Sequence, residues 1–379
     1  MIKRITFILL FLIHFLYPAD NIFRIIASAN INNEIDPCGW KKKPTGGLAR
    51  RATIIDDFKK DIKNYYIVDA GNLLFKKTIL EPGVSAEVAQ INADIILKSF
   101  DKMGCHAFSP GERDFAGGKD FIIKASENTD FPFISCNIYD LNDQLLFDPY
   151  IIYESKGTKI AFIGLSSFFQ SEEVHIKDPI ESLKSILDEV TPKTDIRILL
   201  FSSTNEDMRK VKAEDFDLAM VIRSKNKQKS LDGGKAVPTY SLGDRGRTLY
   251  AFDLEMNDST LEFVDLASSE RIIKEANINL NKMKKGDMLV NLKEVFRNNP
   301  EALEKILAYE TSIQDANQKL ENAINKITMN KVDLGKKIDG RVDILKIVDE
   351  GKVKIKEITR LNPNYKVPHD HNGDGIPDH

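Results

Sequence analysis

The segment DAGNLLF, residues 69–75, places an acid and an amide directly after an apolar run. Residues 65–68 read Tyr-Tyr-Ile-Val, a pattern that predicts a buried strand. Strands of α/β sheets deliver polar side chains to sites at their carboxyl ends. Asp69 is a carboxylate that suits a divalent metal, but Asn72, after the glycine, is a neutral amide. The segment therefore predicts a site at a sheet edge, with an amide where a metal site favours a carboxylate.

A second polar block, GERDF at residues 111–115, carries Glu112, Arg113 and Asp114. Together with Asp69, its two carboxylates make an oxygen-rich set that suits magnesium or calcium. The alternative, which the sequence favours, is that these carboxylates form salt bridges to Arg113 and neighbouring cations.

The C-terminal sequence DHNGDGIPD, residues 370–378, has the D-x-N-x-D-G spacing of calcium-binding loops. Side-chain oxygens would come from Asp370, Asn372 and Asp374. The carbonyl of Ile376 would add a ligand, and Asp378 would close the site. With no glutamate at the twelfth position, the loop resembles those of thrombospondin type 3 repeats more than an EF-hand. We expect calcium here, and a polar tail that binds no ion is the equal alternative.

Apolar runs alternate with amphipathic stretches between residues 22 and 268, which predicts strands alternating with helices. The predicted strands are Ile22–Ala29, Tyr65–Ala70, Phe133–Ile138, Lys159–Gly164, Ile196–Ser202 and Leu218–Ile222. The predicted helices are Gly47–Ile62 and Ser85–Met103. Residues 150–164 have the pattern of a hairpin. We therefore expect an α/β fold with a mixed sheet covered by helices on both sides.

Residues 269–365 have the pattern of a helical extension. Asn299 and Pro300 predict a helix start, with Asn299 as the N-cap. Apolar residues then recur every seven positions, the spacing of a coiled-coil seam, at Ile306, Ile313, Leu320, Ile327 and Leu334. A second amphipathic segment spans residues 338–358. We favour an antiparallel helical hairpin packed on itself, and self-association through the seam is the alternative.

The N-terminus has the composition of an export signal. Lys3 and Arg4 precede an apolar run at residues 5–17, which fits a secretory signal and is too short for a bilayer span. Residues 1–20 are therefore expected to be a signal peptide or a membrane tether of a periplasmic or extracellular protein. The triplet at residues 27–29 looks like a cleavage site but belongs to the first predicted strand.

The net charge and the cysteine content bear on nucleic-acid binding and on disulfide bonds. The net charge of -3 argues against a basic nucleic-acid-binding surface, so no nucleic acid polymer is expected as a partner. Cys38, Cys105 and Cys136 leave one thiol over if two of them pair. One disulfide and three packed thiols are equally compatible with the sequence.

Several landmarks in order make the chain similar to the 5'-nucleotidase branch of the calcineurin-like metallophosphoesterases, over roughly residues 22 to 268. They are PCGW with GGLARRATII at 37–55, DAG at 69–71, GERDF at 111–115, FPFISCNI at 131–138, IAFIGLSS at 160–167 and SLGDRGRTLYAFDLEM at 241–256. The resemblance implies an αββα sandwich with its site at the strand ends. The helical extension at 269–365 and the calcium-loop-like tail at 366–379 would follow this domain.

The resemblance also implies two divalent metals, but the matching positions carry other residues. The family's first Asp-x-His motif falls on Asn30 and Asn32. Its bridging Asp falls on Asn72, or on Asp69 in a shifted register, and its Asn-His pair falls on Glu112 and Arg113. Its later histidines fall on Ser203 and on the segment Ile222-Arg223-Ser224-Lys225.

The histidines elsewhere in the chain do not supply the missing metal ligands. Only His106 and His175 lie in the predicted domain, away from these positions, which is too little imidazole for a dinuclear centre. Arg113, Arg223 and Lys225 would place positive charge where the cations would lie. The resemblance therefore implies a degenerate site, and no dinuclear metal centre is expected.

These three basic residues suggest two uses for the site. Guanidinium groups match phosphate oxygens, so Arg113, Arg223 and Lys225 suit an anionic small molecule such as phosphate or a nucleotide. The alternative, which the sequence favours, is that they pair with the nearby carboxylates and fill the cleft. We expect an exported, catalytically inactive binding or scaffold module. A 5'-nucleotidase-type phosphohydrolase that acts on nucleotides or other phosphoesters with a reduced metal site is the alternative.

Overall fold

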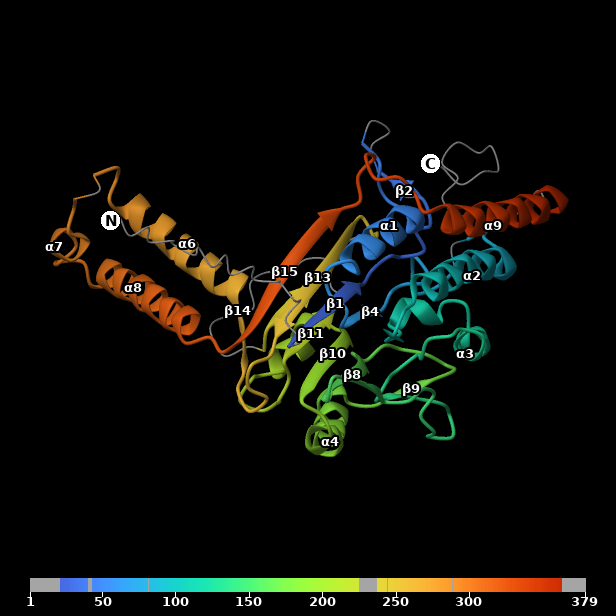
Figure 1. Cartoon of the computed structure of the whole chain (residues 1–379), viewed down its shortest axis with the longest axis horizontal. Coiled ribbons are helices and arrows are strands. Elements are labelled where there is room, and N and C mark those ends of the chain that lie inside the picture. Colours follow the sequence, from blue (N-terminus) through green and yellow to red (C-terminus); the bar gives the residue numbers. More distant parts are fainter. Residues whose placement is uncertain are drawn as a thin grey trace, which may run out of the picture.

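The computed structural model describes residues 21–39, 43–80, 82–224, 237–243, 245–287 and 289–362. Two β-sheets pack face to face, and helices cover the outer face of each sheet (Figure 1). The larger sheet has the strand order β14-β15-β13-β1-β4-β5, and the smaller one has the order β12-β11-β10-β8-β7. These layers confirm the predicted αββα sandwich.

Both sheets are mixed, as predicted. The larger sheet contains β1 (Ile22–Ser28), β4 (Tyr65–Asp69), β5 (Ala107–Phe108), β13 (Thr248–Glu255), β14 (Phe263–Asp265) and β15 (Asn325–Asp333). The smaller sheet contains β7 (Tyr150–Ser155), β8 (Thr158–Ser166), β10 (Ile196–Ser202), β11 (Met220–Arg223) and β12 (Thr239–Ser241). β7 and β8 form the predicted hairpin, while β8, β10, β11 and β12 run parallel. Two short pairs lie outside the main sheets, β2 (Pro37–Cys38) with β3 (Thr45–Gly46) and β6 (Ile138–Tyr139) with β9 (His175–Ile176).

Alternation of side chains along β1 explains how one strand contributes to two cores. Phe23 and Ile25 lie in the core between the sheets, where they are joined by Phe162 and Phe252. Ile26 faces the opposite way and packs in the core beneath the helices. The sandwich is therefore specified by strands that are apolar on both faces.

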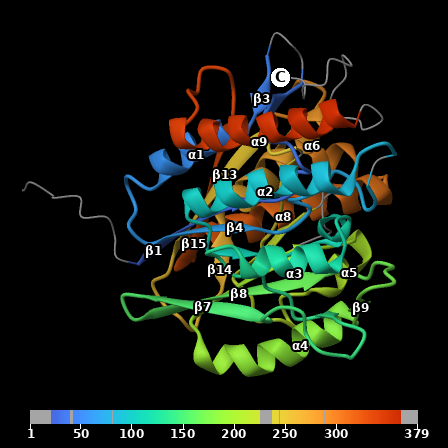
Figure 2. The same cartoon turned by 90° about the vertical axis from the view of Figure 1, so that its right-hand side faces the viewer.

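The helices divide between the two outer faces (Figure 2). α1 (Leu48–Phe58), α2 (Ala86–Met103), α3 (Lys119–Glu127) and α9 (Val342–Leu361) contribute to the core on the larger sheet's outer side. α4 (Pro179–Val190) and α5 (Asn205–Lys210) contribute to the core on the smaller sheet's outer side. The predicted start of α2 is confirmed, because Ser85 caps it by accepting a hydrogen bond from the backbone N–H of Val88.

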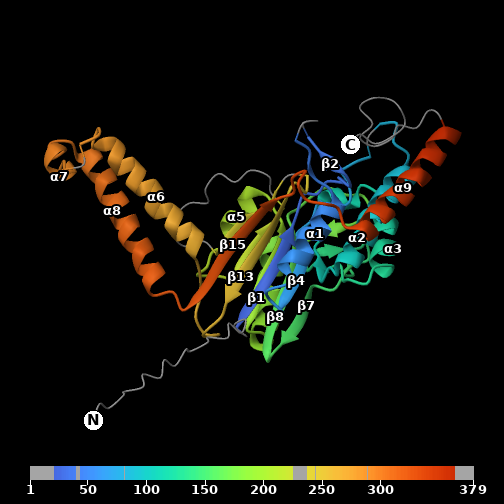
Figure 3. The same ribbon diagram turned by 45° about the horizontal axis from the view of Figure 1, so that its top comes forward.

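α6 (Leu266–Met283), α7 (Leu292–Val295) and α8 (Pro300–Glu321) form an arm that projects from the sandwich (Figures 1 and 3). α6 packs against α8, so the helical hairpin is built from these two helices and the predicted pairing of α8 with the segment at 338–358 is wrong. Asn299 caps α8, as predicted. The heptad prediction is wrong beyond Glu321, because Ile327 lies in β15 and Leu334 follows that strand. Ile327 is buried between the sheets, in a core that local periodicity does not reveal.

The second amphipathic segment forms α9, and it packs against α2 instead of α8. Gly351 allows the two helices to approach closely, since a Cβ there would lie 2.2 Å from the Cδ1 of Ile95. β15 and α9 thus belong to the sandwich, although both lie within the range predicted to be a helical extension.

Two further sequence predictions are resolved by the structure. The strand predicted at residues 133–138 is reduced to bridges at Phe133 and Ile134 before β6 begins. Cys38, Cys105 and Cys136 are all free, so the alternative without a disulfide holds.

Several predictions fall outside the part of the chain that the structure describes. They are the export signal at residues 1–20, Lys225, and the calcium loop with Asp370, Asn372, Asp374, Ile376 and Asp378. Among the described residues, none of the helices combines the length and apolar character needed to cross a bilayer.

Candidate functional site

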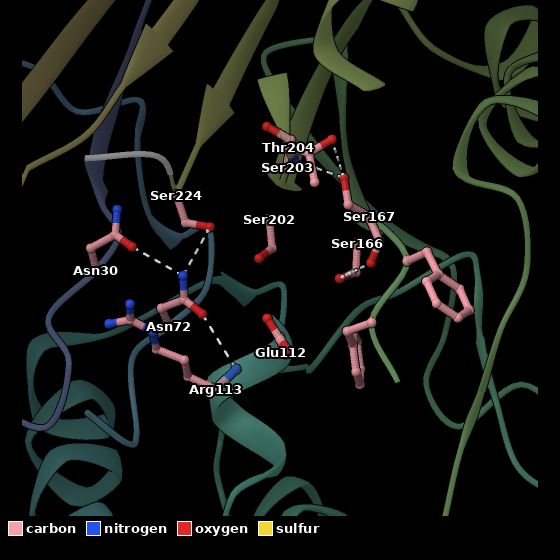
Figure 4. A pocket seen from close by; sticks show the side chains of 12 residues that line it. Asn30, Asn72, Glu112, Arg113, Ser166, Ser167, Ser202, Ser203, Thr204 and Ser224 are labelled. Atoms are coloured by element: carbon pink, nitrogen blue, oxygen red, sulfur yellow. Dashed lines mark hydrogen bonds between the residues drawn. The ribbon is translucent and has the colours of Figure 1, made fainter. Parts of the chain in front are cut away.

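A pocket of about 420 Å³ opens beyond the carboxyl ends of strands from both sheets (Figure 4). Parallel strands end at the same edge of a sheet, so the polar residues that follow them gather in one place. The pocket is lined by Asn30, Asn72, Glu112, Arg113, Ser166, Ser167, Phe168, Phe169, Ser202, Ser203, Thr204 and Ser224. The structure therefore brings together Asn30, Asn72, Glu112, Arg113 and Ser203 from the sequence-predicted set.

Asparagine amides form one wall of the pocket. Asn30, Asn32 and Asn72 have φ angles of 55°, 56° and 56°, in the left-handed region that asparagine tolerates well. Nδ2 of Asn72 donates to Oδ1 of Asn30 at 3.0 Å and to Oγ of Ser224 at 3.5 Å. Oδ1 of Asn72 accepts from the backbone N–H of Arg113 at 3.4 Å. Both amide oxygens are thus already engaged by N–H donors.

Arg113 lies beside these amides at the edge of the pocket (Figure 4). Its Nη1 donates to Oδ1 of Asn32 at 2.9 Å, and its side chain is partly exposed. Asp69 and Asp114, two of the three carboxylates predicted to pair with Arg113, bind other groups. The guanidinium is therefore held by a neutral amide, and no carboxylate of the described residues forms an ion pair with it at the pocket.

Asp114 organises the backbone around the pocket. Its carboxylate is fully buried and accepts four backbone N–H groups at 2.7 to 2.8 Å, from Asn72, Leu73, Leu74 and Gly111. Burial raises the pKa of Asp114 to about 6, although these hydrogen bonds favour the charged form. Asp114 thus joins the segment after β4 to the turn that carries Arg113.

Asp69 at the end of β4 is also fully buried. Its carboxylate accepts hydrogen bonds from Oγ of Ser28 at 2.7 Å and from the backbone N–H of Gly71 at 2.9 Å. Burial raises its pKa to about 7. The predicted metal site at Asp69, Glu112 and Asp114 is wrong, because the two aspartates are engaged internally while Glu112 is exposed. Across the described ranges, no cluster of three His, Cys, Asp or Glu side chains is arranged to hold a metal ion.

Arg223 does not line the pocket, which corrects its predicted role as a direct ligand contact. It is fully buried, and its Nη2 donates to the carbonyls of Ser203 and Thr204 at 3.1 and 3.0 Å and to Oδ1 of Asn205 at 3.1 Å. Burial lowers the pKa of Arg223 to about 10. Arg223 therefore stabilises the turn after β10 through these hydrogen bonds. Lys225, the third predicted basic residue, lies outside the described residues.

Hydroxyl groups form the wall opposite the amides (Figure 4). Oγ of Ser167 donates to Oδ2 of Asp207 at 2.6 Å and accepts from the backbone N–H of Thr204 at 2.8 Å. These contacts fix the segment after β8 to the turn after β10. Sequence reasoning missed this wall, although hydroxyl-rich strand ends signal it, at Ser166, Ser167, Ser202 and Thr204.

The donor set does not fit the dinuclear metal centre that the resemblance implies. The matching positions offer amides that are already hydrogen-bonded, the hydroxyl of Ser203 and the cationic guanidinium of Arg113. Divalent cations in such sites need carboxylate or imidazole ligands, and a fixed positive charge disfavours them. We therefore derive no chemical step through a metal pair at this pocket.

The fold is that of the calcineurin-like metallophosphoesterases. A calcineurin-like phosphoesterase, YfkN from Bacillus subtilis, superposes with a TM-score of 0.50 at 18% identity, covering 62% of this chain and 86% of that one. A 5'-nucleotidase precursor from Thermus thermophilus superposes with a TM-score of 0.60 at 13% identity, covering 89% of this chain and 60% of that one.

Sequence similarity points to the 5'-nucleotidases within this fold. A 5'-nucleotidase of Vibrio cholerae is 31% identical over 157 residues, and one of Vibrio parahaemolyticus is 30% identical over 169 residues. These matches cover 39% and 42% of this chain, but only 28% and 29% of the relatives' own length. No protein-family model matches the sequence. The predicted resemblance to the 5'-nucleotidase branch is confirmed by these similarities.

Proposed function

We propose that this chain is a catalytically inactive module of metallophosphoesterase fold that binds a phosphate-bearing small molecule of the nucleotide class. One observation carries the proposal. Where the family holds metal ligands, this pocket presents the amides of Asn30 and Asn72 and the guanidinium of Arg113. The nucleotide class is inferred from relatives named 5'-nucleotidases.

The chemistry of the pocket supports binding without hydrolysis. Hydrolysis in this fold uses metal ions to generate a hydroxide nucleophile and to neutralise phosphate charge. Glu112 is the one carboxylate among the residues that line the described pocket, and it is exposed. A solvated carboxylate does not by itself lower the pKa of water as a metal pair does. The described lining of the pocket therefore supports binding better than activation of water.

The same residues supply donors for a phosphate group. Among the described residues, the guanidinium of Arg113 donates one hydrogen bond to a side chain, that of Asn32, and a guanidinium group carries five N–H donors. Oγ of Ser203 is buried at the pocket, and no described residue forms a hydrogen bond with it. A buried hydroxyl without a partner costs stability, so an arriving oxygen acceptor would satisfy it. Charge and hydroxyl donors therefore favour an oxyanion at this end of the pocket.

Two measurements on the full chain test the proposal. Calorimetric titration with AMP and with inorganic phosphate in a chelator should show binding, and Arg113→Met should weaken it about tenfold or more through loss of a charge-assisted contact. Arg297→Met, an exposed position on the arm, is the matched control and should bind normally. A phosphate-release assay with manganese or zinc should show no turnover. Metal-dependent turnover that Glu112→Gln abolishes would support a phosphohydrolase instead.

The proposed function includes export of the protein, and this part of the proposal is based on the N-terminal sequence alone. Lys3, Arg4 and the apolar run at residues 5–17 have the pattern of a secretory signal. Fusing residues 1–30 to a reporter that is active only outside the cytoplasm tests this. Reporter activity equal to that of a leaderless fusion would contradict export.

A further inference from the structure

Phe168 is an apolar side chain exposed within a polar pocket. It is 68% exposed, whereas its neighbours Ser167 and Phe169 are 5% and 6% exposed. Scattered apolar residues are common on protein surfaces and need no explanation. Phe168 differs from these because it lines the same pocket as Arg113 and Ser203, whose buried hydroxyl has no partner within the described part of the chain.

The residues on either side hold Phe168 in place. On one side, Ser167 is fixed by hydrogen bonds with Asp207 and Thr204. On the other side, the ring of Phe169 packs against that of Phe115, with 5.5 Å between centroids. Phe115 lies two residues after Arg113 in the same short 3-10 helix, so this contact also ties the Phe168 segment to the cationic side of the pocket.

The pocket also has room for more than a phosphate group. Its volume of about 420 Å³ falls in the range of about 300–1,000 Å³ that is typical of sites for whole small molecules. Such sites combine a few placed polar groups with apolar or aromatic surface. Here the polar groups are Arg113 and Ser203, and Phe168 supplies the exposed aromatic surface.

We propose that Phe168 is a specificity-determining residue that contacts a planar ring carried by the bound ligand. The inference rests on the proposed function, and it adds which residue contacts the heterocycle of a nucleotide-class ligand. Aromatic side chains stack on planar bases whatever the base, because every base presents a π-face. Phe168 is pre-organised for this contact, because the residues on both sides of it are held in place.

Calorimetric titration of the full chain with four probes tests the inference. The probes are inorganic phosphate, ribose 5-phosphate, AMP and adenosine, all in a chelator. AMP should bind about tenfold more tightly than ribose 5-phosphate, because only AMP carries the stacking base. Phe168→Ala should remove most of this difference, and Phe168→Tyr should retain it. Leu141→Ala is the matched control, since Leu141 is 69% exposed and does not line the pocket.

The outcomes separate this inference from the proposed function. If phosphate binds but Phe168→Ala leaves the ratio of AMP to ribose 5-phosphate affinity unchanged, the inference fails and the proposed function stands. If adenosine binds in a Phe168-dependent way and phosphate does not bind, the proposed function fails and the ring contact stands. Equal weakening of all four probes in Phe168→Ala would assign the residue to pocket structure and overturn the inference. Loss of self-association as the sole effect would assign it to a protein contact and overturn the inference too.

Discussion

Arg113 and Asn32 are joined by a hydrogen bond of 2.9 Å from Nη1 to Oδ1, at two positions where the family resemblance places metal ligands. The amide is neutral, so it orients the guanidinium without cancelling its charge. A carboxylate in its place would form an ion pair and compete with any anionic ligand. The pair therefore keeps a directed positive charge at the pocket.

This relationship predicts the effect of the isosteric change Asn32→Asp. The new carboxylate lies within hydrogen-bond distance of Arg113, so the affinity for AMP should fall about tenfold or more. Thermal stability should not fall, because the new pair is attractive. Calorimetry and thermal unfolding at about pH 7.5 measure the two effects. An unchanged affinity would show that the Arg113 charge does not attract the ligand.

Asp114 predicts a change in stability that is separate from binding. In Asp114→Asn, an NH₂ group replaces one of the two carboxylate oxygens, each of which accepts two backbone N–H groups. The NH₂ group would then point at two N–H donors and could accept from neither. We expect the free energy of unfolding to fall by about 3 kcal/mol. The exposed Asp120→Asn in the first turn of α3 should change it by less than about 0.5 kcal/mol. Urea unfolding at about pH 7.5 compares them, and equal losses would show that the Asp114 network adds no particular stability.

Local patterns were sufficient for β1, β4, β8, β10 and β11 and insufficient for the C-terminal third. β1 and β4 are largely apolar runs, and Ser85 is a local capping signal, so each could be identified from neighbouring residues. Ile327 continues a seven-residue spacing from α8 yet lies in β15, which pairs with β13 from a distant part of the chain. Such long-range pairing leaves no local trace, so the helical pattern gave the wrong element.

The candidate site was predictable where it follows strand ends and hidden where it depends on packing. Asn30 and Asn72 follow apolar strands closely, which marked them. Phe168 joins them only because the second sheet packs on the first, which no single segment shows. The burial of Arg223 could be predicted from the sequence. Side chains alternate along β11, so Arg223 lies on the same face as Val221, which packs in the core on the smaller sheet's outer side.

Metal binding should differ sharply between the pocket and the C-terminal tail. The pocket's amides and Arg113 should bind no stoichiometric manganese or zinc, whereas the loop at residues 370–378 should take up one calcium ion per chain. Asp374→Asn should abolish the calcium uptake and leave the pocket unaffected. Equilibrium dialysis followed by elemental analysis measures both. Two manganese ions per chain in the Asp374→Asn variant would contradict the degenerate site.

At Gly351, where α9 packs against α2, we expect packing to affect stability more than helix propensity does. Gly351→Ala gains about 1 kcal/mol of helix propensity but places a methyl group 2.2 Å from Cδ1 and 2.4 Å from Cγ1 of Ile95. Overpacking of this kind costs about 1–3 kcal/mol, so we expect net destabilisation. In an Ile95→Ala background the clash is absent, and the same substitution should stabilise the chain. Thermal unfolding of the wild type, the two single variants and the double variant measures both effects. If Gly351→Ala changes stability with the same sign in both backgrounds, the clash is ruled out.

Asp69 predicts how stability depends on pH. Its pKa is raised from 3.8 to about 7 by burial, so the folded chain binds this proton more tightly than the unfolded chain does. The resulting stabilisation is full below about pH 4 and is lost as the pH rises toward about 7, a change on the order of 4 kcal/mol. Asp69→Asn removes the titrating group, while the amide oxygen of the substituted side chain can still accept from the backbone N–H of Gly71. The difference in unfolding free energy between wild type and variant, from urea titrations at about pH 4.5 to 7.5, should therefore decline with rising pH. A difference that stays constant over this range would mean that Asp69 is ionised throughout in the folded chain.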